Sequence, residues 1–295
     1  MKVDFGEVLT AMVTPFKEDG VVDYDRAEEL AVWLAENGSD GLVVHGTTGE
    51  SPTLTHEEEY ELYRVVKKAV GSKAKVIAGT GSNSTATSIV TSLEAERVGF
   101  DGCMLVVPYY NKPSQEGLFQ HFKAVSEATP LPLIIYNIPG RTAVNLLPET
   151  VARIAELENV VAIKEATGDL NQVLKIRKLT GADFLIYSGD DSLTLPILAS
   201  GGTGIISVAS HLVGGEIKKM VGLFKKGKVS EALEINLKLM PLFSVLFITT
   251  NPVPVKAALE LVGRPVGKPR LPLVEATNSE KEAIKKVLQE LNLLK

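Results

Sequence analysis

The chain has 295 residues, 45% of them hydrophobic, so it can bury a large core, and its formal net charge of −5 is spread along the sequence. The lack of a basic cluster argues against a nucleic-acid partner, and the single cysteine, Cys103, excludes an intrachain disulfide. The N-terminus lacks the apolar core of a signal peptide, and the most apolar stretch, residues 240–248, has about half the length of a membrane span. We therefore expect a cytoplasmic protein with no membrane or nucleic-acid partner.

Short apolar runs recur along the chain, each rich in Val, Ile or Leu and without a clean alternation of polar residues. This composition is typical of strands that are covered on both faces, as in a parallel sheet. The sequence therefore predicts eight strands, within residues 8–16, 41–48, 75–82, 102–110, 131–139, 160–167, 184–191 and 202–210.

Helical patterns with recognisable ends lie between these runs. Asp23 is placed to cap a helix over residues 24–36, and Thr55 with Glu58 has the spacing of a capping box. Pro148 suits the first position of a helix. A strand, a loop and a helix that repeat eight times predict a (β/α)8 barrel. A doubly wound open sheet is the alternative, although the first turn, TPFKEDG, is no dinucleotide-binding fingerprint.

Strand signals stop after about residue 223, whereas helical periodicity continues through 228–247, 253–262 and 279–293. We expect two parts on this basis. The first is a catalytic barrel over residues 1–223, and the second is a C-terminal helical domain over residues 224–295.

In a barrel of this kind the active site lies at the carboxyl ends of the strands. Lys164 stands there, at the end of the apolar run VVAIK. Its burial would lower its pKa, whereas an ordinary lysine needs about 4.6 kcal/mol to become neutral at pH 7. A neutral amine can add to a ketone and form a Schiff base. An ion pair with Glu165 or another neighbour is the alternative, although adjacent side chains on a strand point to opposite faces.

Two residues with hydroxyl groups end the second and the fifth predicted strands. Tyr136 ends the strand before Lys164 and could shuttle protons during imine formation, or it could simply pack at the end of the barrel. Thr47 could link that path to solvent, although GTTG is also an ordinary turn sequence. The four histidines, at positions 45, 56, 121 and 211, lack metal-ligand spacing, so we expect structural or surface roles for them.

Several motifs follow one another over most of the predicted barrel: GTTGES (46–51), GTGSN (79–83), VVPYYNKPSQEGL (106–118), YNIPGRT (136–142), AIKEATGDL (162–170) and SGDD (188–191). Together they closely resemble the dihydrodipicolinate synthase family of pyruvate-dependent class I aldolases, to which N-acetylneuraminate lyase is related. The resemblance implies a TIM barrel with C-terminal helices, a homotetramer built as a dimer of dimers, and no metal or redox cofactor.

The resemblance also implies the reaction and its catalytic residues. Pyruvate would condense with L-aspartate 4-semialdehyde to give 4-hydroxy-tetrahydrodipicolinate, for lysine and diaminopimelate synthesis. Lys164 matches the lysine that forms the Schiff base with pyruvate. The family relays protons through three hydroxyl groups, which match those of Tyr136, Thr47 and Tyr110. Tyr110 is expected to reach into the site of a partner subunit.

Four further positions match residues that bind the substrates. Thr48 matches the contact to the pyruvate carboxylate, and Arg141 matches the arginine that binds the carboxylate of the second substrate. Gly189 and Ile206 match positions that line the pocket. Another pyruvate aldolase, such as N-acetylneuraminate lyase or a 2-keto-3-deoxy sugar acid aldolase, is the alternative. GTTGE together with Arg141 favours the synthase. A non-catalytic pyruvate sensor on the same fold is a further alternative.

The resemblance extends in part to an effector site for free lysine at a dimer interface. Ser51, His56, Asn83 and Tyr109 match that site. Three other positions depart from it: Pro52 replaces a small residue, Glu59 replaces a histidine, and Thr87 replaces the glutamate that meets the ammonium group of lysine. We therefore predict weak or absent inhibition by lysine.

Overall fold

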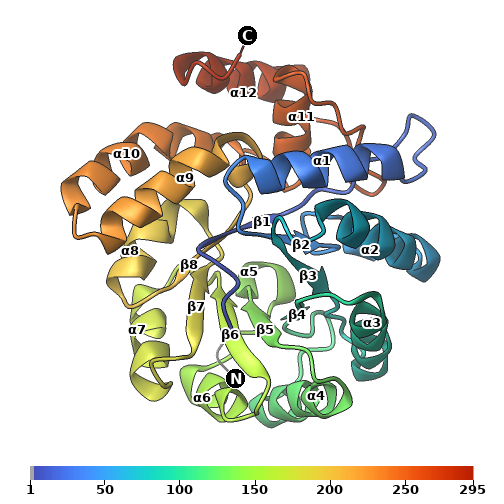
Figure 1. Cartoon of the computed structure of the whole chain (residues 1–295), viewed down its shortest axis with the longest axis vertical. Helices are drawn as coiled ribbons and strands as arrows, with labels where there is room; N and C mark the ends of the chain where they lie inside the picture. Colours follow the sequence, from blue (N-terminus) through green and yellow to red (C-terminus); the bar gives the residue numbers. More distant parts are fainter. Residues whose placement is uncertain (1–2, 295) are drawn as a thin grey trace.

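The computed structural model describes residues 3–294, in which eight short parallel strands close into a barrel (Figure 1). Each strand pairs with the next in chain order, and β1 also pairs with β8. The (β/α)8 barrel is thus confirmed, and the doubly wound sheet is wrong. The strands are β1 (Val8–Ala11), β2 (Gly41–Val44), β3 (Lys75–Gly79), β4 (Gly102–Val106), β5 (Leu133–Asn137), β6 (Val160–Glu165), β7 (Leu185–Ser188) and β8 (Gly204–Ser207).

A ring of helices surrounds the strands (Figure 1). Each connection from one strand to the next contains at least one helix, as the pattern of the sequence predicts. The helices are α1 (Tyr24–Glu36), α2 (His56–Val70), α3 (Thr85–Val98), α4 (Gln115–Ala128), α5 (Pro139–Thr142), α6 (Pro148–Ala155), α7 (Leu170–Leu179), α8 (Thr194–Ala199) and α9 (Ser210–Lys225), with 3-10 turns η1 (Ser51–Thr53) and η2 (Asp191–Leu193).

The predicted helix ends are also confirmed. The Asp23 side chain accepts a hydrogen bond from the Arg26 N–H at the start of α1. Thr55 and Glu58 form a complete capping box at the start of α2, and Pro148 is the first residue of α6. Each cap satisfies backbone N–H groups that have no partner within the helix.

Two apolar layers hold the barrel. An inner layer of side chains, including Leu9, Ile77, Tyr187 and Ile206, fills its interior, and a larger outer layer lies between strands and helices. All six residues of β6 are buried, because the strand is covered on both faces. Strong burial on both sides is what makes a lysine on β6 unusual.

The C-terminal helices are α10 (Val229–Val245), α11 (Val253–Leu261) and α12 (Asn278–Glu290), close to the predicted ranges. α10 packs along α9, and α12 packs on both α10 and α11. Figure 1 shows α11 and α12 beyond α1, on one side of the barrel. α9 ends at Lys225 and so extends across the predicted domain boundary at 223/224, and the division into two domains stays a prediction.

Over residues 3–294, no helix has the length and apolar character needed to cross a membrane.

Candidate active site

Lys164 lies inside the barrel and is only 5% exposed. Its strand, β6, pairs with β5 so that Lys164 lies directly beside Tyr136. The Lys164 Nζ is 4.1 Å from the centre of the Tyr136 ring. The structure thus brings together the two residues that the sequence singled out for Schiff-base chemistry.

Burial lowers the pKa of Lys164 to about 7, against an ordinary value of 10.5. The Asp191 carboxylate opposes this shift, and the Arg141 guanidinium adds to it. At neutral pH a substantial share of this amine is therefore uncharged. An uncharged amine is the form that can attack a carbonyl carbon.

Glu165 points away from Lys164 and has other partners. Its carboxylate accepts hydrogen bonds from Asn137 at 3.1 Å, from Gln172 at 3.2 Å and from the Thr167 N–H at 2.8 Å. Within the described residues Lys164 forms no ion pair. The alternative of an ion pair between Lys164 and Glu165 is therefore wrong, because the two side chains lie on opposite faces of β6.

Tyr136 is buried, and burial raises the pKa of its phenol to about 12. The charge of Arg141 and a hydrogen bond from Thr47 both lower that pKa, but burial prevails. The phenol therefore keeps its proton at neutral pH and can donate it to a developing hydroxide or alkoxide. Thr47, in the turn that follows β2, thus contacts the Tyr136 hydroxyl group, to which the sequence analysis linked it.

Tyr110 behaves differently, because 88% of its side chain is exposed. Its φ of +72° lies in the left-handed region, where residues other than glycine are uncommon. None of the contacts described for Lys164 or Tyr136 within the chain involves Tyr110. One copy of the chain therefore does not place this residue in its own site.

The residues expected to bind carboxylates lie near a segment that follows α10. Thr48 is 4% exposed, and its Oγ1 accepts a hydrogen bond from the Asn251 Nδ2 at 2.9 Å. The Arg141 Nη2 donates to the Asn251 carbonyl oxygen at 3.2 Å. Asn251 thus links two positions that are far apart in the sequence.

Gly189 lies against the reactive amine. A Cβ at this position would come within 2.6 Å of the Ala166 Cβ and 3.2 Å of the Lys164 Cε, so only glycine fits. Its N–H donates to the Glu165 carbonyl oxygen at 2.8 Å. Ile206, on β8, is buried in the inner layer of the barrel.

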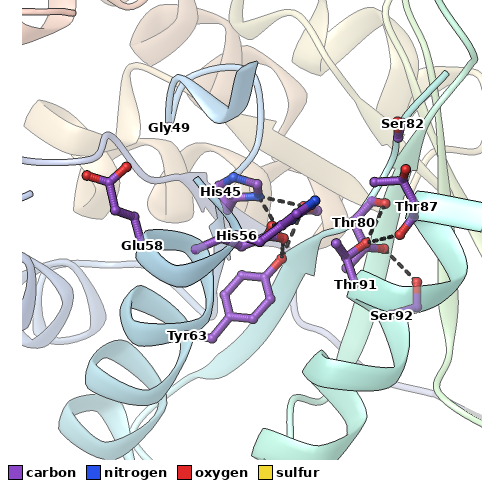
Figure 2. Close-up of polar contacts among 12 residues, drawn as sticks. His45, Gly49, His56, Glu58, Tyr63, Thr80, Ser82, Thr87, Thr91 and Ser92 are labelled. Carbon is purple, nitrogen blue, oxygen red and sulfur yellow. Dashed lines mark hydrogen bonds and ion pairs between the residues drawn. The ribbon is translucent and has the colours of Figure 1, made fainter. Parts of the chain in front are cut away.

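A second cavity of about 140 Å³ opens between η1, α2 and α3. Glu59 forms one wall of it, and the Glu59 carboxylate accepts from the Tyr63 hydroxyl at 2.7 Å, from the His56 Nδ1 at 3.0 Å and from the His45 Nδ1 at 3.1 Å. Burial raises the pKa of Glu59, but these donors together hold it below its ordinary value. Figure 2 shows the three donors converging on one side and Thr87 on α3 opposite them.

The residues predicted for the effector site are only partly gathered around this cavity. Ser51, His56 and Tyr109 line it, together with Thr87. Asn83 is not among the described residues that line it, and the Asn83 carbonyl accepts a hydrogen bond from the Asn111 side chain at 2.8 Å.

Comparison with known proteins shows which family the chain is similar to. The model of the dihydrodipicolinate synthetase family matches residues 4–291. The chain belongs to this family. It is 60% identical over 292 residues to a 4-hydroxy-tetrahydrodipicolinate synthase from a Cyanothece species, covering 99% of both chains. It is also 60% identical to the synthase of Moorella thermoacetica, covering 99% of this chain and 100% of that one.

A solved structure of a family member has the same fold as this chain. The crystal structure of the enzyme from Cyanidioschyzon merolae with lysine bound superposes with a TM-score of 0.97 at 52% identity, covering 98% of this chain and 99% of that one. The match to the family thus covers residues 4–291, including the helices that follow the barrel.

Sequence reasoning missed several polar residues around the site of this family member. Asp191 is buried, and its carboxylate accepts from the N–H groups of Val208 and Ala209, both at 3.1 Å, and from the Ser207 hydroxyl. Its signal was the SGDD motif, which ends β7. Burial raises the pKa of Asp191, and its charge acts on Lys164.

A buried ion pair was also missed. The Lys256 Nζ lies 2.6 Å from the Glu50 Oε1, and the Glu50 Oε2 accepts from the Arg270 N–H at 2.9 Å. Glu50 has a φ of +57° at the end of the GTTGE loop. The segment around α11 therefore holds the loop that carries Thr47 and Thr48.

Proposed function

We propose that this chain condenses pyruvate with L-aspartate 4-semialdehyde to 4-hydroxy-tetrahydrodipicolinate, in lysine and diaminopimelate biosynthesis. The observation that carries the proposal is the Lys164 amine, buried against Tyr136 with a pKa of about 7. The synthases of Cyanothece and Moorella, 60% identical to this chain over nearly its full length, support the choice of reaction.

The reaction starts with the neutral amine of Lys164. It adds to the ketone carbon of pyruvate, and the carbinolamine then loses water to give an iminium ion. Loss of a proton from the methyl group gives an enamine, whose carbon attacks the aldehyde of the second substrate. The amino group of that substrate then displaces the lysine, so the ring closes and Lys164 is regenerated.

Hydroxyl groups move the protons of these steps. Tyr136 keeps its proton at neutral pH and donates it to the hydroxyl group that leaves the carbinolamine. Thr47 contacts Tyr136 and returns a proton to the phenolate that remains. Tyr110, from a partner subunit, completes the relay toward solvent.

Four residues bind the substrates in this proposal. Thr48 binds the pyruvate carboxylate, through its hydroxyl group and the backbone N–H groups of its loop. The Arg141 guanidinium binds the carboxylate of the second substrate, because its planar group can donate two parallel hydrogen bonds to a carboxylate. Gly189 leaves room beside the Lys164 side chain, and Ile206 supplies an apolar wall.

We also propose a homotetramer, assembled as a dimer of dimers, in the cytoplasm, with residues 224–295 as its C-terminal helical domain. The 88% exposure of Tyr110 supports the dimer, because a partner subunit would cover this ring.

The cavity beside Glu59 is proposed as a degenerate effector site for free lysine. The relative from Cyanidioschyzon merolae was solved with lysine bound. Here the Glu59 carboxylate is already occupied by His45, His56 and Tyr63, and Thr87 offers no negative charge to an ammonium group. The site is therefore poor in the charge that a lysine ligand needs.

Borohydride trapping tests the proposed function. Wild-type protein mixed with pyruvate and borohydride should gain one reduced pyruvate on Lys164, measured by mass spectrometry of the peptides. Lys164→Ala should gain none. An adduct on a different lysine contradicts the mechanism. A trapped protein that forms no product with L-aspartate 4-semialdehyde would instead be a pyruvate sensor or an aldolase for another substrate.

A further inference from the structure

Asn251 connects the two residues assigned to the carboxylates of the two substrates. Its side-chain amide donates to Thr48, and its backbone carbonyl accepts from Arg141. The side chain is buried, with only 5% exposed. One residue outside the barrel strands thus touches both carboxylate-binding positions.

The hydrogen bond from Asn251 to Thr48 restricts the direction in which the Thr48 hydroxyl proton can point. Because Oγ1 accepts the amide N–H of Asn251, the hydroxyl proton must point elsewhere. Among residues 3–294 that proton has no acceptor, although Thr48 is only 4% exposed. A buried donor without an acceptor is unfavourable, so it is suited to an acceptor that arrives with a ligand.

We propose that Asn251 is a positioning residue for pyruvate, which turns the Thr48 hydroxyl proton toward the pyruvate carboxylate. The inference rests on the proposed function and deepens it. The Asn251 backbone carbonyl holds Arg141 in addition, and this contact survives any change of the Asn251 side chain. Replacing the side chain therefore separates the pyruvate contact from the contact to the second substrate.

Two variants test the direction of the hydrogen bond. Asn251→Ala removes the donor and lets the Thr48 hydroxyl rotate. Asn251→Asp keeps the size of the side chain but replaces the donor with an acceptor, so the Thr48 proton turns away from pyruvate. Asn251→Asp should therefore impair pyruvate binding more than Asn251→Ala does. If Asn251 only packed against Thr48, the order would be reversed, because Asp keeps the size of the side chain and Ala does not.

Asn236 on α10 provides the matched control. Like Asn251, it is a buried asparagine whose Oδ1 has no hydrogen-bond partner among residues 3–294, but it lies on a helix that carries no proposed site residue. Asn236→Ala should leave the pyruvate dependence unchanged, whatever it does to stability.

The measurement is the fraction of protein trapped by borohydride as the pyruvate concentration rises, together with kcat and the KM for each substrate. The half-saturating pyruvate concentration should rise about five- to tenfold in Asn251→Ala, since one hydrogen bond is lost. It should rise further in Asn251→Asp. The KM for the second substrate and kcat should change less, because Arg141 keeps its backbone contact.

A double-mutant comparison makes the test specific. In a Thr48→Val background, Asn251→Ala should have no further effect on half-saturation, because the hydroxyl group that it orients is gone. An unchanged half-saturation in Asn251→Asp, or an effect of Asn251→Ala that persists in Thr48→Val, overturns the inference. If wild-type protein is not trapped at all, the proposed function itself fails.

Discussion

The lowered pKa of Lys164 follows from what surrounds it. Burial removes most of the water that would solvate an ammonium ion, and Arg141 adds a nearby positive charge. Asp191 restrains the shift, so the pKa stays near 7 rather than falling further. A value close to the working pH gives both a neutral nucleophile and an amine that is readily protonated when it leaves.

The first prediction concerns the pH dependence of imine formation. Below about pH 7 the Lys164 amine is mostly protonated, so the trapping rate with pyruvate and cyanoborohydride should rise about tenfold per pH unit. Above about pH 8 the rate should level off, because the amine is already neutral. Arg141→Leu should move this break to higher pH, since the positive charge of Arg141 lowers the pKa of Lys164.

An unperturbed lysine provides the contrast. Its pKa of about 10.4 would make the rate continue to rise up to about pH 10. A wild-type rate that still climbs tenfold between pH 8 and 9 would therefore contradict the lowered pKa.

At the scale of elements, the barrel and the proximity of Lys164 to Tyr136 could be predicted because their signals are local. Apolar runs mark the strands, caps mark the helices, and Lys164 and Tyr136 end adjacent strands that pair in register. The parallel sheet then brings such strand ends together without further information.

The missed residues depend on long-range contacts. Asn251 and Thr48 are 203 positions apart, and Glu50 meets Lys256 across a similar separation. No periodicity links such pairs. His45 and His56 were expected to have structural or surface roles, but the sequence did not show that both contact Glu59. They do so because the end of β2 and the first turn of α2 approach each other there. Only the tertiary fold shows these clusters.

The second prediction concerns the cavity between α2 and α3. A charged hydrogen bond contributes about 1.5–3 kcal/mol, so Thr87 in place of a glutamate should weaken lysine binding by about ten- to a hundredfold. The Glu59 carboxylate does not fully replace that partner, because it already accepts from three donors. Initial rates against added L-lysine, at fixed pyruvate, should show little inhibition.

Thr87→Glu is the matched variant for this test. It restores a carboxylate on α3 that faces the cavity, and inhibition by lysine should then appear or strengthen. Half-inhibition of the wild-type protein below about 1 mM, a binding free energy beyond roughly 4 kcal/mol, would show that the prediction is wrong.

At the scale of the whole molecule, one chain brings together only part of the proposed proton relay. Lys164, Tyr136 and Thr47 lie together within one barrel, whereas the Tyr110 ring stands exposed. Its left-handed φ is an unfavourable backbone conformation for a tyrosine, and such strain persists where the surrounding structure or function requires it. A symmetric dimer would let each subunit supply Tyr110 to the other.

The last prediction tests this exchange. Tyr110→Phe keeps the ring but removes its hydroxyl group, so it should lose much more activity than pyruvate affinity. Lys164→Ala should be inactive.

When the two variants are unfolded together, refolded and verified as mixed oligomers, half of the dimers contain one site with an intact Lys164 and a partner's intact Tyr110. Activity should then recover to about a quarter of the wild-type value, because that is the share of complete sites. Mixing Tyr110→Phe with the double variant Tyr110→Phe/Lys164→Ala keeps Lys164 but supplies no intact Tyr110, so it should show only the residual activity of Tyr110→Phe. Recovery above this control in the first mixture establishes a shared site. A first mixture that stays as inactive as this control, despite verified mixed dimers, would place the Tyr110 hydroxyl outside the neighbouring relay.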